Sequence, residues 1–244
     1  QRRRRPRHRA GAVVTPYYSD DHVTLYHGDA RDFLDLTADV LITDPPYGVG
    51  LTTKTSDYRD SAAFDGGQSL KASRLYRDDP THVRGLVITV VGPLIGRIGR
   101  ALVFPGPRMM FAYPDPAAVG GVFTPNGAGR SPWGFQCLHP ILYYGKDPYL
   151  ADGKGSRPNG FRDEQPNPEK WDHPCPKPLS WMRWAVVRAS REGETVLDPF
   201  AGTGTTLAAA KALGRKAVGV ELEERYCEQA ALRLSQEVLG LEAA

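Results

Sequence analysis

The chain has 244 residues, of which 41% are apolar and 24% are charged. This size and composition predict one large domain with a packed core, and they exclude a chain that is disordered throughout. The 26 glycines and 21 prolines predict long loops around that ordered centre.

The net charge of +3 depends on the N-terminus, because residues 2–9 hold six arginines and no acid. Of the 31 basic residues, 25 remain outside this stretch, against 28 acidic ones, so the folded body is slightly acidic. We predict a basic disordered tail at 1–12 and a single domain at 13–244. An arm that grips nucleic-acid phosphates is the alternative interpretation of the tail.

The three cysteines, Cys137, Cys175 and Cys227, are too widely spaced for a disulfide framework or a Cys-x-x-Cys metal site. The six histidines are equally dispersed, so we predict no metal. No apolar run reaches the length of about 18 residues that a membrane span needs. These features predict a cytoplasmic protein in a reducing compartment, with no membrane partner.

In the first half of the chain, predicted strands and helices alternate and are separated by segments rich in turn residues. The stretch at 48–80 shows no sustained period and is predicted to be a mobile loop or lid. The predicted elements are, in order, a strand at 23–27, a short helix at 30–36, a buried strand at 39–43, a helix at 81–99 kinked at Pro93, and a strand at 101–104.

The second half continues the alternation, interrupted by a second predicted mobile loop at 145–170 that is rich in glycine and proline. Its predicted elements are strands at 109–112, 119–123 and 135–144, a helix at 179–189, a strand at 195–197, a helix at 205–213, a strand at 216–220 and a helix at 223–238. Alternating strands and helices predict an open, mostly parallel sheet with helices on both faces.

Residues 196–206 read Val-Leu-Asp-Pro-Phe-Ala-Gly-Thr-Gly-Thr-Thr, the pattern of a strand, a glycine turn and a helix start. Gly202 and Gly204 let the backbone approach a ligand closely. Glu221 ends the next strand, where a carboxylate can accept hydrogen bonds from ribose hydroxyls. The segment lacks the third glycine of dinucleotide-binding sites and the lysine of a P-loop, so a nucleoside cofactor is predicted. A tight turn that binds no ligand is the alternative. Two residues can cap the following helix: Thr205 and Thr206.

Residues 44–47 read Asp-Pro-Pro-Tyr and follow the buried strand at 39–43. Pro45 and Pro46 fix the backbone and remove two N–H donors, which leaves carbonyl groups pointing outward. Asp44 and the Pro45 carbonyl can each accept a hydrogen from an exocyclic amino group and so aim its lone pair at an activated methyl group, while Tyr47 stacks on the base. A strand-terminating turn with a packed tyrosine is the alternative.

Together these segments resemble the DNA amino-methyltransferases that modify N6 of adenine or N4 of cytosine. Asp44-Pro45-Pro46-Tyr47 matches the family's catalytic signature, and residues 198–204 match its cofactor signature. His173-Pro174-Cys175-Pro176-Lys177-Pro178 matches a third element, His-Pro-x-x-Lys-Pro, and Gly28-Asp29-Ala30 looks like the family's Gly-Asp turn. The order of these segments is that of the circularly permuted beta group.

The resemblance implies a Rossmann-like fold with a mostly parallel seven-stranded sheet and S-adenosyl-L-methionine as cofactor. It places the strands that end at Asp198 and Asp44 side by side, so that both turns face one crevice. Lys177 is implied to hold the methionine end of the cofactor, and Asp29 its adenine. The implied cofactor-binding residues are Asp29, Ala30, His173, Lys177, Pro178, Asp198, Phe200, Gly202, Gly204, Thr205, Thr206 and Glu221.

Ser131-Pro132-Trp133-Gly134 and the stretch at 138–146 resemble compact phage-type DNA methylases. A large separate target-recognition domain is missing from the pattern, so sequence reading is expected to fall to the loops at 48–80 and 145–170. Tyr58 and Phe64 are minor candidates to fill the gap that a flipped base leaves.

The resulting hypothesis is methyl transfer to the amino group of a flipped DNA base, in a bacterial or phage-encoded enzyme of the kind found in restriction-modification. Adenine N6 is favoured, because the family's cytosine N4 enzymes more often carry serine before the prolines. The alternatives are cytosine N4, an RNA or protein-glutamine substrate, and a non-catalytic DNA-binding module. The expected partner is double-stranded DNA, with single-stranded DNA left open, and a homodimer is implied by the resemblance alone.

Overall fold

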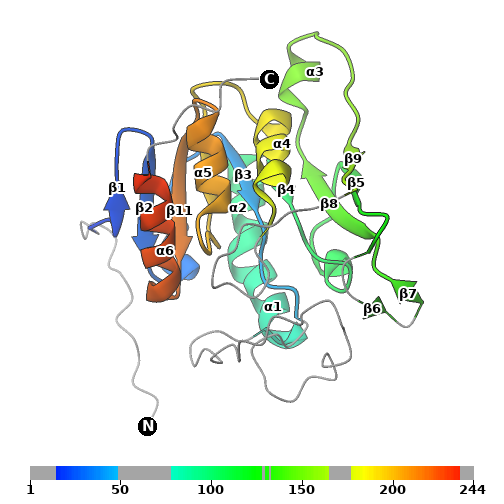
Figure 1. Ribbon diagram of the computed structural model, residues 1–244, viewed down its shortest axis with the longest axis horizontal. Coiled ribbons are helices and arrows are strands. Elements are labelled where there is room, and N and C mark those ends of the chain that lie inside the picture. Colours follow the sequence, from blue (N-terminus) through cyan, green and yellow to red (C-terminus); the bar gives the residue numbers. More distant parts are fainter. Residues whose placement is uncertain (1–14, 49–77, 128–129, 132, 165–176, 237–244) are drawn as a thin grey trace.

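The computed structural model describes residues 15–48, 78–127, 130–131, 133–164 and 177–236 (Figure 1). Its centre is a nine-stranded sheet in the order β1-β2-β11-β10-β3-β4-β8-β5-β9, accompanied by the two-stranded β6–β7 hairpin. The strands are β1 Tyr18–Ser19, β2 Val23–His27, β3 Val40–Thr43, β4 Ala101–Val103, β5 Ala118–Phe123, β6 Arg130–Ser131, β7 Gly134–Phe135, β8 Leu138–Tyr144, β9 Gly160–Arg162, β10 Thr195–Asp198 and β11 Lys216–Glu221.

Five neighbouring strands, β2, β11, β10, β3 and β4, run parallel. β8 pairs antiparallel with β4, and β5 antiparallel with β8. The expected seven-stranded sheet is therefore present, and two short strands, β1 and β9, extend its edges. This is the mostly parallel α/β sheet that the alternation predicted, in the Rossmann-like form that the resemblance implied.

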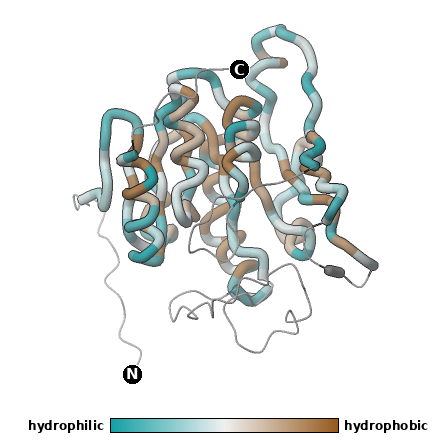
Figure 2. The backbone as a smooth tube through the Cα atoms, viewed as in Figure 1, coloured by the Kyte–Doolittle hydropathy of each residue, from teal (hydrophilic) through white to brown (hydrophobic). Residues whose placement is uncertain are grey.

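Helices cover both faces of the sheet (Figure 1). One face carries α4 Leu179–Ala189, α5 Thr205–Ala212 and α6 Glu224–Ser235. The other carries a continuous helical segment of α1 Pro80–Leu86, a π turn at Val87–Val91 and α2 Gly92–Ile98. Figure 2 shows the apolar residues concentrated where the helices meet the strands.

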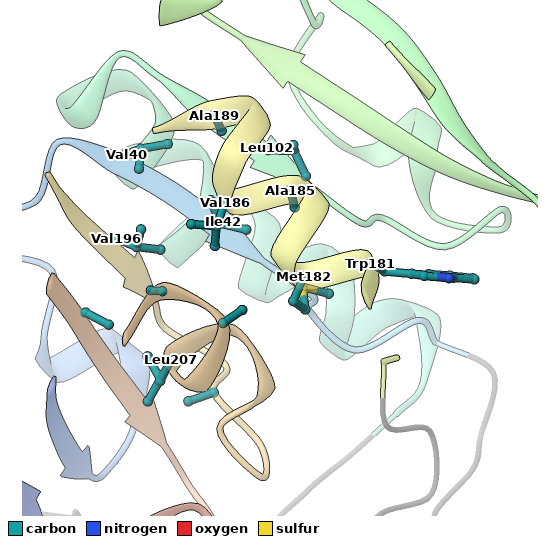
Figure 3. Packing of buried hydrophobic residues seen from close by; sticks show 14 of the residues in the cluster. Val40, Ile42, Leu102, Trp181, Met182, Ala185, Val186, Ala189, Val196 and Leu207 are labelled. Atoms are coloured by element: carbon teal, nitrogen blue, oxygen red, sulfur yellow. The ribbon is translucent and has the colours of Figure 1, made fainter. Parts of the chain in front are cut away.

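Alternate residues of β3 supply both halves of the core. Val40 and Ile42 pack with α4, as Figure 3 shows, and Leu41 packs on the opposite face with α1 and α2. All four residues of β3 are buried. A strand without a solvent face must lie in the middle of the sheet, and this fixes the position of the turn that follows it.

Three local expectations need correction. The predicted helix at 30–36 is a single 3₁₀ turn at Ala30–Asp32 that Asp29 caps, and the predicted strand at 109–112 is a 3₁₀ turn at Met110–Ala112. The predicted kink at Pro93 takes the form of the π turn: the Gly92 N–H reaches back to the Val87 carbonyl, and this wider turn relieves the crowding that proline causes.

Part of the stretch at 145–170 lies within the described residues and contains α3 Pro148–Ala151 and β9. The Asp147 carboxylate accepts hydrogen bonds from Arg157, at 2.6 Å, and from Arg188 of α4. This ion network ties the segment that contains α3 to α4. The predicted mobility of the loop at 145–170 stays a prediction, and the stretch 49–77 of the other predicted loop lies outside the described residues.

Candidate active site

The carboxyl ends of the parallel strands meet at one edge of the sheet. Along that edge, β2 is followed by Asp29, β11 ends at Glu221, β10 ends at Asp198, and β3 is followed by Asp44. Between β10 and β3 the chain connections run in opposite directions, to β11 on one side and to β4 on the other. Such a switch point is the place where open α/β sheets bind ligands.

A hydrogen bond joins the two predicted turns directly. β10 and β3 are parallel neighbours, and the Thr43 hydroxyl donates to Asp198 Oδ1 at 2.7 Å although the residues lie 155 positions apart. Asp198 also accepts from the Phe200 N–H at 3.1 Å. The Asp198 carboxylate therefore holds the 198–204 turn to the strand that carries the 44–47 turn.

Three side chains form a closed group at the 44–47 turn. The Tyr47 hydroxyl donates to Asp44 Oδ1, and the Lys177 ammonium donates to the Tyr47 hydroxyl. Lys177 Nζ also lies 2.9 Å from Asp44 Oδ2 and 4.5 Å from the centre of the Tyr47 ring. Lys177, implied to hold the methionine end of the cofactor, thus lies against the Asp44 carboxylate.

The Tyr47 ring packs against the backbone of Gly106, in the segment that follows β4. A Cβ added at Gly106, after β4, would meet Tyr47 Cδ1 at 2.6 Å, and Gly106 has a φ of +66°. The end of the turn is held by Asp78, whose Oδ1 accepts the Gly48 N–H at 2.6 Å. Neither Gly106 nor Asp78 was singled out from the sequence, because their roles depend on contacts across the fold.

The 198–204 turn has the open backbone that the sequence predicted. Gly202 and Gly204 have φ values of +52° and +76°. Glu221 lies beside them, with Oε2 accepting the Gly202 N–H at 2.8 Å and Oε1 accepting the Glu223 N–H at 2.8 Å. Each carboxylate oxygen keeps a further lone pair, so Glu221 can hold the turn and still accept a hydrogen bond from a ligand.

The two threonines after the turn do not cap α5 as expected. Gly204 is the N-cap residue, and no side chain hydrogen bond caps the helix. Thr205 accepts from the buried Arg233 guanidinium at 2.7 Å, and the Thr206 hydroxyl donates to the Met182 sulfur at 3.6 Å. Both threonines are buried behind the turn, where they stabilise its backbone.

The remaining predicted cofactor residues are placed as follows. Asp29 caps the 3₁₀ turn and pairs with Arg31, and Ala30 is buried beside it. The Gly28 N–H donates to the Glu221 carbonyl at 2.8 Å, which brings this turn next to Glu221. Pro178 is buried at the start of α4, Phe200 packs against the α1–α2 side of the core, and His173 lies outside the described residues.

Burial makes this edge ready to accept a cation. Desolvation raises the pKa of Asp198 to about 6 and that of Glu221 to about 7, and it also raises the pKa of Asp44 against the opposing effect of Lys177. A positive charge bound here would be stabilised by the ionised carboxylates. S-adenosylmethionine, which carries a sulfonium and an ammonium group, has the charge that these residues fit.

Two further observations concern the described part of the chain. Within it, no group of three or more His, Cys, Asp or Glu side chains is arranged to hold a metal ion. No helix there is both long and apolar enough to cross a bilayer.

Comparisons with known proteins agree with this geometry. Residues 143–232 match the N6_N4_Mtase family, described as DNA methylase. The chain is 26% identical to the type II methyltransferase M2.DpnII of Streptococcus pneumoniae, over 93% of this chain and 95% of that one. A shorter stretch of 64 residues is 45% identical to the type II methyltransferase M.HinfI of Haemophilus influenzae, over 26% of this chain and 18% of that one.

Solved structures share the fold. The PvuII DNA methyltransferase, specific for cytosine N4, gives a TM-score of 0.65 at 15% identity, covering 93% of this chain and 91% of that chain. The M1.HpyAVI complex with S-adenosylmethionine gives 0.61 at 21% identity, covering 87% and 99%. The fold is that of the S-adenosylmethionine-dependent DNA methyltransferases, and the sequence matches support an amino-methyltransferase of the N6-adenine/N4-cytosine family.

Proposed function

We propose that this protein transfers the methyl group of S-adenosyl-L-methionine to the exocyclic amino group of a flipped DNA base, with adenine N6 favoured. The observation that carries the proposal is the 2.7 Å hydrogen bond between Thr43 and Asp198. It ties a turn suited to an amino group to a turn suited to a cationic nucleoside, at the switch point of the sheet. The family match and the type II relatives support the same reaction class.

The chemistry asked of the protein is orientation. The cofactor, when bound, supplies a methyl group already activated by its sulfonium. Asp44 and the Pro45 carbonyl accept the two amino hydrogens, which draws the nitrogen lone pair out of conjugation with the ring. When the nitrogen takes the methyl group, the sulfur keeps the electron pair of the broken bond, and the nitrogen releases one proton to the Asp44 carboxylate. The base must leave the duplex to reach these acceptors. Holding nitrogen and methyl carbon in line is the main source of rate acceleration.

Lys177 adjusts the charge of this site. Burial raises the pKa of Asp44, and the Lys177 ammonium, on a side chain only 8% exposed, opposes this rise and so favours the ionised carboxylate as an acceptor. The Asp44 and Tyr47 contacts that Lys177 makes are the ones that the target base needs. The entering base therefore shares or replaces them.

The preference for adenine rests on Asp44 in the position where cytosine N4 enzymes more often carry serine. Cytosine N4 is the first alternative, and the likeness to the PvuII enzyme extends to the fold alone. An RNA or protein-glutamine substrate is disfavoured, because those enzymes usually carry the Pro-Pro-Tyr segment after the glycine turn. A non-catalytic DNA-binding module is disfavoured, because it would have no use for Glu221 or Lys177.

The test is transfer of labelled methyl from S-adenosylmethionine to unmethylated genomic DNA, followed by digestion and nucleoside mass spectrometry. We expect N6-methyladenine that disappears in Asp44→Ala, a variant that should still bind the cofactor. N4-methylcytosine would keep the mechanism and correct the base. No methylated nucleoside from a protein that binds the cofactor would redirect the proposal to RNA or protein. Light scattering would show whether the protein forms the homodimer that the family resemblance implies.

A further inference from the structure

The β6–β7 hairpin (residues 130–135) presents aromatic surface to solvent. Trp133 lies at its tip, next to the paired Ser131 and Gly134, and its side chain is 99% exposed. Phe135, at the end of β7, is 68% exposed. An exposed indole gives up the hydrophobic gain of burial, so two neighbouring exposed aromatics indicate a binding surface.

The hairpin lies at the same edge of the sheet as the 44–47 turn. Val103 at the carboxyl end of β4 pairs with Leu142, and β8 begins four residues earlier, at Leu138. At about 3.3 Å per residue, the first four residues of β8 extend about 13 Å past the carboxyl end of β4, on the side of the sheet where the 44–47 turn lies. The hairpin is attached at that overreaching end, whereas α3 lies at the opposite edge (Figure 1).

The root of the hairpin packs against α4, the helix that begins two residues after Lys177. His139, the second residue of β8, packs edge-on against Trp181 with ring centres 4.8 Å apart. Burial and then the charge of Lys177 lower the pKa of His139 to about 4.

The root is also well anchored. The Thr124 N–H donates to the Cys137 carbonyl at 2.8 Å, and the Thr124 hydroxyl lies 3.2 Å from His139 Nε2. Phe135 packs over Gly127, where an added Cβ would come within 2.7 Å of Phe135 Cβ. The hairpin thus has a defined direction relative to the site, as a group that must enter a partner needs.

We infer that Trp133 stacks into the DNA duplex beside the target base and occupies the space that the flipped base leaves. This inference rests on the proposed function. Double-stranded DNA is the partner that fits, because a flipped base leaves a flat apolar gap at the mouth of the active site, and an indole has the shape and surface to stack between the remaining bases. Tyr58 and Phe64, the candidates suggested by the sequence, lie outside the described residues.

The experiment compares wild type, Trp133→Ala and Trp133→Phe in binding and methylation, with Leu150→Ala as the matched control. Leu150 is an exposed apolar residue of α3, 53% exposed, at the opposite edge. The probes are a short duplex carrying the sequence found methylated in genomic DNA, the same duplex with 2-aminopurine at the target, and the same duplex with the target mispaired. Should genomic DNA not be methylated, a random duplex and its abasic-site version replace them in the binding arm.

We expect Trp133→Ala to bind the paired duplex on the order of tenfold more weakly, as the loss of one stacking contact with a base predicts. The variant should also lose the increase in 2-aminopurine fluorescence that accompanies flipping of the target base. Mispairing lowers the energy of flipping and should restore much of the methylation by Trp133→Ala. Trp133→Phe should retain most activity, and Leu150→Ala all of it.

Equal binding, flipping and methylation by Trp133→Ala and wild type would overturn the inference. So would a loss of activity that is the same on paired and mispaired DNA, or a change in oligomeric state that explains it, since the hairpin would then serve contact with a second copy. Weaker duplex binding by Trp133→Ala, in a protein that methylates no nucleoside, would keep the hairpin as a DNA contact and reject the proposed reaction.

Discussion

Replacing Glu221 with glutamine tests the electrostatics of the cofactor edge. Glu221 is 8% exposed, and burial raises the pKa of its carboxyl group from 4.5 to about 7. The folded protein therefore holds this proton over a pH range in which the unfolded chain has released it. The free energy of unfolding of the wild type should fall as the pH rises through that range, and the glutamine variant should lack this fall.

The magnitude follows from the two pKa values. A rise from 4.5 to about 7 corresponds to about 3 kcal/mol lost on ionisation. Glutamine has one acceptor oxygen in place of two, so either the Gly202 or the Glu223 N–H loses its partner, at a cost of about 1–3 kcal/mol. The variant should thus be the less stable protein near pH 5, and the difference should close or reverse near pH 8.

Urea denaturation of both proteins at about pH 5 and about pH 8 measures this directly. The control is Glu228→Gln, which changes an exposed carboxylate on α6 and should alter the stability little at either pH. The same stability difference between wild type and Glu221→Gln at both pH values would refute the reasoning. Calorimetry should also show at least about tenfold weaker S-adenosylmethionine binding by Glu221→Gln, equivalent to one lost hydrogen bond to the cofactor.

Three further changes probe the contacts that hold the 44–47 turn. Thr43→Val removes a buried hydroxyl that donates to the carboxylate at the end of β10, and it should lower the free energy of unfolding by about 1.5–3 kcal/mol at neutral pH, as measured by denaturation. Gly106→Ala should displace the Tyr47 ring and lower methyl transfer, whereas Gly99→Ala, at a similar φ of +76° but with no atom within 4 Å of its added Cβ, should leave activity unchanged; equal losses in both would argue against the ring contact. Lys177→Met removes the cation that opposes the burial-driven rise in the pKa of Asp44, so the rising limb of the pH–rate profile should move to higher pH if Asp44 has the proposed role, and an unmoved limb would contradict that role.

The sequence alone determined the elements whose periodicity is strong. The buried strand at 40–43, the helix at 179–189 and the strand–turn–helix around Gly202 follow from residues that lie next to one another in the chain. Short segments with little periodicity were predicted wrongly, because the prediction depends on periodicity. A short run such as 30–36 contains too few apolar positions to distinguish a helix from one capped turn, and Asp29 decides it by a local hydrogen bond.

Only the tertiary structure decided how the site is assembled. The neighbouring positions of β3 and β10 were expected from resemblance and not from any local pattern, because the two strands come from distant parts of the chain. Gly106 beneath Tyr47, Lys177 against Asp44 and the raised pKa of Glu221 depend on which segments become neighbours and how much water they exclude. Sheet order is chosen by burying both faces of the central strands at once, and that long-range condition is not written in any single stretch of residues.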